Sequence, residues 1–310
     1  MTNRHEILLV AKDKALYFFP SITDIDVISG YELLHPEFYL ANRLRLKNYQ
    51  LIIFLDNGFQ PAMAARIRPY TKAKIVLFFW NHFREPKHFA MLSAAKNEVA
   101  LDEIAHFDAI EAKTLRLTHN SSFYSKNMVI HDTPISYDIF FGATNNGRKE
   151  KAMELKKKFQ ELGLRAYYHI LMARGNEQPG YLPYNEYVEI VAQTRGILEL
   201  LREGQQGVTL RTFESLFFQK KLITANEALL HYRFYDPKNI FLIQEHTLDE
   251  LPEFLNQPVQ ETPSDVLEFF DVASWARRFV ESRPGLFEEY EYYPSLLEKV
   301  TVTDEEWLVN

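Results

Sequence analysis

Residues 203–226, EGQQGVTLRTFESLFFQKKLITAN, combine a glycine-bearing turn with the start of a helix. We expect that helix to open near Thr212 or Phe213. Backbone N–H groups at a helix start attract anions, and Arg211 beside them adds a planar fork of two donors. Glu214, inside the helix, is placed to accept hydrogen bonds from paired hydroxyls. The stretch therefore predicts a site for a molecule that carries both phosphate and neighbouring hydroxyl groups.

Short apolar runs lie on both sides of this stretch, and each is short enough to be a strand buried on both faces. Between many of these runs lie segments whose apolar residues recur at helical spacing. This alternation predicts parallel sheets covered by helices on both sides. The predicted fold class is α/β, with two Rossmann-like βαβ lobes that face a cleft. The predicted strands are Ile7–Ala11, Leu51–Leu55, Ile75–Trp80, Glu103–Phe107, Asp138–Phe141, Arg165–Ile170, Ile197–Leu200, Leu222–Thr224 and Ile240–Ile243.

Apolar residues at helical spacing predict the connecting helices. Gly163 stands where a glycine commonly follows a helix C-terminus, so it should close the helix before it. Besides the helix that carries Glu214, the predicted helices are Phe38–Leu46, Pro61–Ile67, His88–Ala95, Lys149–Leu162, Tyr184–Thr194, Ala228–Tyr232, Leu248–Leu255 and Val266–Glu281.

The length of 310 residues is too great for one ordinary core and indicates two domains. A polar segment with a proline at 118–137 marks the boundary. We expect an N-terminal lobe at 1–130 and a C-terminal lobe at 131–265. The remaining residues, 266–310, should form a helix and a tail that caps the fold or crosses back to the first lobe.

The composition is that of an ordinary soluble globular protein, with 46% hydrophobic and 25% charged residues. A formal net charge of -7 argues against a broad surface for nucleic acid. The absence of cysteine excludes disulfides, thiolate metal sites and a cysteine nucleophile. No apolar run approaches the roughly 18 residues of a membrane span. We therefore expect a cytoplasmic protein with at most peripheral contact with the inner membrane face.

The segment Gly142–Arg148, GATNNGR, lies between a predicted strand and a predicted helix. Open α/β sheets bind phosphate at such loops. The segment lacks the GxGxxG spacing and the GK[ST] ending, so neither a dinucleotide fingerprint nor a P-loop is supported. An ordinary loop whose glycines satisfy the backbone geometry remains the alternative.

The stretch at 203–226 resembles the nucleotide-binding segment in the C-terminal lobe of GT-B glycosyltransferases. It is most similar to bacterial proteins of lipopolysaccharide or capsule glycosyl transfer and to the CgeB-like group. Further resemblance lies in FFWN at 78–81, FFGATNNGR at 140–148 and YLPYNEY at 181–187. The residues of the stretch that match are Gly204, Gln205, Gly207, Thr209, Arg211, Glu214, Ser215, Lys220, Lys221, Leu222, Ile223, Thr224 and Asn226.

The resemblance implies that the second lobe holds a nucleotide-sugar donor and the first lobe an acceptor. Glu214 would bind the ribose hydroxyls, while Arg211 and Arg148 would neutralise the diphosphate. Glu214 could instead be a helix N-terminal carboxylate stabilised by the helix dipole alone. The other donor-side residues would be Gly142, Tyr184, Gln206, Gly207, Thr209 and Leu210.

One departure from the family pattern concerns the mechanism. Retaining enzymes of this fold often carry two glutamates eight positions apart, and the earlier position here is Gln206. The pair therefore cannot be used to assign a retaining outcome.

An inverting transfer needs a general base beside the acceptor hydroxyl. In a parallel sheet the candidates follow the carboxyl ends of the strands. Asp56 and His82 each combine a proton acceptor with the end of a strong N-terminal strand, and Asn81 lies beside His82. Each could instead be a cap or a loop hydrogen-bonding residue. The full set at these strand ends is Lys12, Asp13, Asp56, Asn57, Asn81 and His82.

Metal and hydrolase motifs find no support. Asp24 and Asp26 form an Asp-x-Asp pair without further ligands, which is a weak metal site. The sequence contains no HExxH and no GxSxG. We therefore expect no metal and no cofactor.

The predicted function is a glycosyltransferase that moves a sugar from a nucleotide donor to a glycan or lipid-linked glycan acceptor, as in lipopolysaccharide or capsule synthesis. A nucleotide-sugar epimerase of similar architecture is an alternative within enzymes. A non-catalytic glycan-assembly protein that keeps the two-lobed shape is the alternative outside them.

Overall fold

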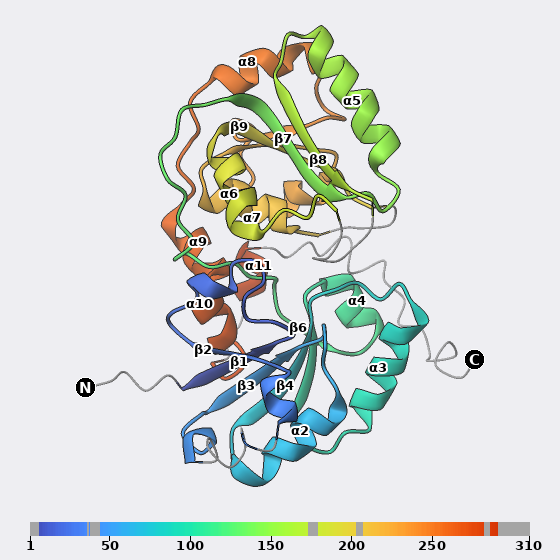
Figure 1. Ribbon diagram of the computed structural model, residues 1–310, viewed down its shortest axis with the longest axis vertical. Coiled ribbons are helices and arrows are strands. Elements are labelled where there is room, and N and C mark those ends of the chain that lie inside the picture. The colour runs from blue at the N-terminus through green and yellow to red at the C-terminus, as the bar shows by residue number, and fades with distance from the viewer. Residues whose placement is uncertain are drawn as a thin grey trace. The chain divides into compact units, whose positions relative to one another are not determined.

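The computed structural model describes residues 6–35, 37, 44–172, 179–202, 207–281 and 286–290 (Figure 1). The chain forms two compact units. Unit 1 holds the described residues up to Asn127 and those from Phe270 to Glu288, and unit 2 holds those from Met128 to Phe269 with 289–290. The predicted helix Phe38–Leu46 and the predicted roles of Gly204, Gln205 and Gln206 lie wholly or largely outside the described residues.

Unit 1 contains a six-stranded parallel sheet in the order β2-β1-β3-β4-β5-β6. The predicted strands are confirmed, although β4 begins and ends one residue earlier than predicted and β5 ends one residue earlier. Sequence analysis missed β2 and β6, because β2 carries polar residues and β6 is only two residues long. The strands are β1 Ile7–Ala11, β2 Asp26–Ser29, β3 Leu51–Leu55, β4 Lys74–Phe79, β5 Glu103–His106 and β6 Thr118–His119.

Both faces of this sheet are covered, as the continuous apolar strands require. One face packs Phe54 of β3 with Met63 of α2 and Leu92 of α3 in a single core. On the strand β4, Phe78 contacts Trp275 of α10, with ring centroids 4.9 Å apart. The helices involved are α2 Pro61–Ile67, α3 Pro86–Lys96 and α10 Val272–Arg277, and α4 Ala109–Thr114 follows β5.

The prediction of one helix over Val266–Glu281 is wrong, because the chain forms α9 (Ser264–Phe270) and α10 with Asp271 between them. Asp271 has an extended backbone and accepts a hydrogen bond from Ala273 N, so it caps α10. Its neighbours also pair with Tyr124: Tyr124 N donates to Phe270 O at 2.9 Å, and Val272 N donates to Tyr124 O at 2.8 Å. These bonds hold α10 in unit 1.

Unit 2 contains a five-stranded parallel sheet in the order β11-β10-β9-β7-β8. The chain runs from β7 outward to β8 and then returns to the other side of β7 to form β9. The strand order therefore reverses between β7 and β9, which is where open α/β sheets bind ligands. The strands are β7 Tyr137–Thr144, β8 Ala166–Leu171, β9 Thr194–Glu199, β10 Lys221–Thr224 and β11 Ile240–Leu242.

Helices cover both faces of the second sheet (Figure 1). Phe141 of β7 shares a core with Phe159 of α5 and Leu251 of α8. Across the sheet, the ring of Phe140 lies 5.1 Å from that of Tyr187 on α6. The helices are α5 Lys149–Glu161, α6 Tyr184–Ala192, α7 Leu210–Phe217 and α8 Leu251–Asn256, with 3-10 turns at Glu227–His231 and Leu248–Glu250.

Several boundaries in unit 2 differ from the prediction. β7 continues to Thr144, so the predicted loop Gly142–Arg148 begins three residues too early. α7 begins at Leu210, before the predicted start, because the Thr209 side chain caps it. Gly163 does close α5: it has φ +73° and donates from its N–H to Gln160 O. Among the described residues no helix combines the length and hydropathy needed to cross a membrane.

Candidate functional site

Arg148 joins the loops on the two sides of the switch point in unit 2. Its guanidinium donates to Leu200 O after β9 at 3.0 Å and to Thr144 O at the end of β7 at 2.6 Å. A third, longer bond reaches Asn145 O. Arg148 is buried, so direct contact with a diphosphate would require exchange of these main-chain bonds. Its predicted role in neutralising phosphate stays a prediction.

Arg211 lies in the first turn of α7 and reaches the main chain of β7. Its Nε donates to Gly142 O at 3.0 Å, and its Nη2 donates to the same oxygen. A Cβ atom on Gly142 would lie 2.4 Å from the ring of Tyr187 and 2.8 Å from that of Phe140. Gly142 is therefore needed for close packing of α6 on the sheet, whatever ligand the site takes.

Glu214 is buried within α7, with 1% of its surface exposed. Tyr184 donates its hydroxyl to one carboxylate oxygen at 2.9 Å, and Tyr187 donates to the other at 2.7 Å. The two tyrosine rings are stacked, 5.6 Å apart and 11° from parallel. Burial raises the pKa of Glu214 to about 7, although Arg211 and the two phenols favour the charged form. Near neutral pH this carboxyl group is therefore able to gain or lose a proton.

The N-terminus of α7 is fixed by a second buried carboxylate, Glu199, at the end of β9. It accepts hydrogen bonds from the hydroxyls of Thr209 at 2.5 Å, Thr212 at 2.8 Å and Thr224 at 2.6 Å. The Thr209 hydroxyl oxygen also accepts from Arg211 N at 3.1 Å. This carboxylate ties the start of α7 to β9 and β10.

The turn before α7 is held from β10 as well. Asn226 donates its side-chain amide to Gly207 O at 2.8 Å, and Gly207 has φ +81°, a conformation that favours glycine. Leu210 is the first residue of the helix. The structure thus brings Gly142, Tyr184, Gly207, Thr209, Leu210, Arg211 and Glu214 to α6, α7 and the strand ends beside them.

In unit 1, two of the predicted catalytic residues bind each other. Asp56, which follows β3, accepts from Asn81 Nδ2 at 3.0 Å and from Trp80 N at 3.1 Å. Burial raises the pKa of Asp56, against the opposing hydrogen bonds from Asn81 and Trp80. Both carboxylate oxygens have donors, so Asp56 fixes the turn that follows β4.

His82 belongs to a cluster that sequence analysis did not recognise. Glu111 of α4 lies between two imidazoles, 2.9 Å from His82 Nδ1 and 3.0 Å from His106 Nε2. Phe83 N donates to the same carboxylate at 3.1 Å. Burial alone would raise the pKa of Glu111, but the hydrogen bonds from His106 and His82 lower it to about 2. Glu111 is therefore an anion held between two histidines.

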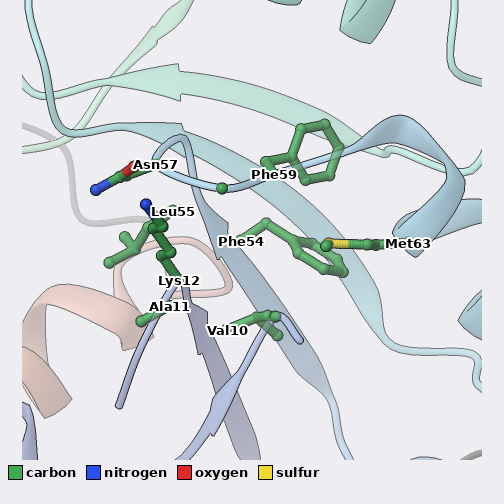
Figure 2. A pocket seen from close by; sticks show the side chains of 10 residues that line it. Val10, Ala11, Lys12, Phe54, Leu55, Asn57, Phe59 and Met63 are labelled. Atoms are coloured by element: carbon green, nitrogen blue, oxygen red, sulfur yellow. The ribbon is translucent and has the colours of Figure 1, made fainter. Parts of the chain in front are cut away.

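A shallow dent lies between the ends of β1 and β3, where the strand order of unit 1 reverses, and side chains leave no room in it for a water molecule (Figure 2). Figure 2 shows Phe54, Phe59 and Met63 on one side of it and Lys12 and Asn57 on the other.

The described residues contain no group of three or more histidine, aspartate or glutamate side chains that could hold a metal ion. Asp26 of the Asp-x-Asp pair lies in β2 and accepts from Arg45 at 2.7 Å and from Tyr49 at 2.6 Å.

Together the two parallel sheets define an α/β protein with two Rossmann-like lobes. No family model and no curated protein matches the chain. Among solved structures, the chain is similar to the β-glucosyltransferase of phage T4, at 14% identity over 90% of this chain and 95% of that one, with a TM-score of 0.45. It is also similar to the NAD-bound 3-phosphoglycerate dehydrogenase of Entamoeba histolytica, at 10% identity over 92% of this chain and 98% of that one, with a TM-score of 0.21. Neither likeness is close enough to carry an argument about function.

Proposed function

We propose that the protein is a glycosyltransferase whose unit 2 binds a nucleotide-sugar donor and whose unit 1 binds the acceptor. One observation carries this proposal: a buried carboxylate, Glu214, receives two hydroxyl hydrogen bonds beside the switch point of unit 2. A carboxylate that already accepts from two neighbouring hydroxyls has the arrangement that the diol of a ribose needs. Tyr184 and Tyr187 would give up these bonds when the ribose binds.

The rest of the donor would lie toward the start of α7. Arg211 contributes a cation in the first helical turn, and the N–H groups of that turn favour an anion. Arg211 would exchange its bonds to Gly142 O for bonds to phosphate. The resemblance of the stretch at 203–226 to GT-B nucleotide-binding segments supports the same assignment.

The acceptor would lie at the carboxyl edge of the unit 1 sheet, which carries the candidates Asp56, Asn81 and His82. From the resemblance we propose a lipopolysaccharide or capsule glycan, free or lipid-linked, as the acceptor class. The reaction would take place in the cytoplasm, with the protein at most peripherally attached to the membrane.

The variant Glu214→Gln tests donor binding. It keeps the size of the side chain and removes the anionic acceptor. We expect loss of charged hydrogen bonds to weaken nucleotide-sugar binding by about 1.5 to 3 kcal/mol, or roughly 10- to 150-fold in Kd. Isothermal titration calorimetry with UDP-, GDP-, ADP- and CMP-linked sugars measures this.

Glu253→Gln is the matched control, because Glu253 is exposed on α8 on the opposite face of the same sheet. It should leave Kd unchanged. The proposal fails if the wild type binds no nucleotide sugar, or if Glu214→Gln binds one as tightly as the wild type does.

A further inference from the structure

Three elements of unit 1 bring titratable side chains to one place. His82 follows β4, His106 is the last residue of β5, and Glu111 lies in α4. All three are at the carboxyl edge of a parallel sheet, where Rossmann-like folds place their chemistry. The carboxylate of Glu111 contacts one imidazole with each of its oxygens.

The hydrogen bonds define the proton positions on both rings. Asp108 N donates to His106 Nδ1 at 2.9 Å, so the proton of a neutral His106 is on Nε2 and points to Glu111. The remaining oxygen of Glu111 lies 2.9 Å from His82 Nδ1 and requires a proton there. A neutral His82 therefore carries its lone pair on Nε2.

That lone pair is unused. Within the described residues, Nε2 of His82 is buried and has no hydrogen-bond partner, and the whole side chain is 10% exposed. The ring of Phe107 lies against His82 edge to face, 4.7 Å away. A buried acceptor without a donor is unfavourable, and a hydroxyl group that reached it would relieve that cost. Asp56 differs, since both of its oxygens already have donors.

We propose that His82 Nε2 is the general base for the acceptor hydroxyl and that Glu111 is the positioning residue that fixes its tautomer. This inference rests on the proposed function. In the step, the acceptor oxygen forms a bond to the sugar C1 while its proton passes to His82 Nε2. The bond from C1 to the phosphate oxygen breaks, and its electron pair leaves on the nucleotide. A single displacement of this kind inverts the configuration at C1.

Two variants separate these roles. His82→Asn places an amide N–H near the position of Nδ1, so it can still donate to Glu111, but it has no Nε2. Glu111→Gln keeps the shape of the positioning residue and removes its charge. His35→Asn is the control, because His35 is an exposed histidine of the same unit.

The first measurement is turnover of the bound nucleotide sugar with water as the acceptor, followed by nucleotide release and by proton NMR of the released sugar. His82→Asn should lower the rate by about 100-fold or more and leave the calorimetric Kd for the donor unchanged. Glu111→Gln should also lower the rate at unchanged Kd, and His35→Asn should match the wild type. The sugar should appear first as the inverted anomer.

The second measurement is nitrogen NMR of the histidine rings. Neutral His82 should carry its proton on Nδ1 in the wild type and lose this preference in Glu111→Gln. A proton on Nε2, full turnover by His82→Asn, a retained anomer, or a wild type that binds donor without turnover would each overturn the inference. If the wild type binds no donor, the proposed function itself fails and this inference falls with it.

Discussion

At the scale of single residues, Glu214 couples the candidate donor site to pH. Burial raises its pKa from 4.5 to about 7, so between these values the folded protein holds a proton that the unfolded chain releases. The stabilisation from this proton is complete below about pH 4.5, declines as the pH rises, and is lost above about pH 7. Because the side chain is fully buried, the difference between its two pKa values corresponds to a change of about 3 kcal/mol in the free energy of unfolding.

Urea denaturation from pH 5 to pH 8 measures this contribution. Relative to Glu214→Gln, the wild type should lose free energy of unfolding as the pH increases through this range. If the free energies of unfolding of the two proteins changed with pH in parallel, Glu214 would titrate in the folded protein as it does in the unfolded chain.

The local sequence pattern was sufficient to select Glu214 as a candidate site residue, but it did not select Glu111. Arg211, Glu214 and the turn before them are neighbours in the chain, so their pattern is visible in the sequence. Glu111 acts on His82 from 29 residues away, through the packing of α4 beside two strand ends. His106 could have been found, because it lies one residue before the end of a predicted strand just as His82 follows one.

At the scale of elements, the position of α7 depends on the hydroxyl groups around Glu199. Thr224→Val keeps the shape of a fully buried side chain but removes one donor to Glu199 and the acceptor for Asn226 N. We expect a loss of about 1 to 3 kcal/mol in stability, because a buried carboxylate loses a partner. Donor affinity should fall as well, since Arg211 and Glu214 move with the helix.

Urea denaturation and donor calorimetry measure the two effects. Thr118→Val, at an exposed position of β6, should change neither. A Thr224→Val protein with wild-type stability would mean that Glu199 does not need this hydroxyl.

The sequence predicted most elements because buried parallel strands are continuous apolar runs, as in Leu51–Leu55. It failed where tertiary contacts override the local pattern. Apolar spacing continues on both sides of Asp271, and the break between α9 and α10 comes from the Asp271 cap together with the pairing of its neighbours with Tyr124. β7 extends past Gly142 because its partner β8 continues to Leu171 beside it.

At the scale of the whole molecule, Trp275 should stabilise unit 1 and not unit 2. Its side chain is fully buried and stacks on Phe123 with ring centroids 4.0 Å apart. Trp275→Ala should cost about 3 to 5 kcal/mol, from lost burial and the cavity that remains. Hydrogen exchange in each unit, measured by mass spectrometry, should show faster opening of β3 and β4 and unchanged exchange in β7 and β9.

Val280→Ala, a change at a half-exposed position just after α10, serves as the control and should have little effect on either unit. Equal acceleration of exchange in both units of Trp275→Ala would show that the two sheets unfold as one cooperative body.

The pairing of Tyr124 with the chain around Asp271 has a consequence for the order in which the protein is made. Residues 128–269 of unit 2 leave and re-enter unit 1 close to residues that are hydrogen-bonded to each other, so this segment is an insertion within unit 1. On the ribosome, all six strands of the first sheet emerge before the helix α10, which covers Phe78 and Phe123, has been translated. Residues 128–269 are therefore made while their host still exposes an aromatic surface, and a nascent chain paused at this point presents that apolar surface to a chaperone.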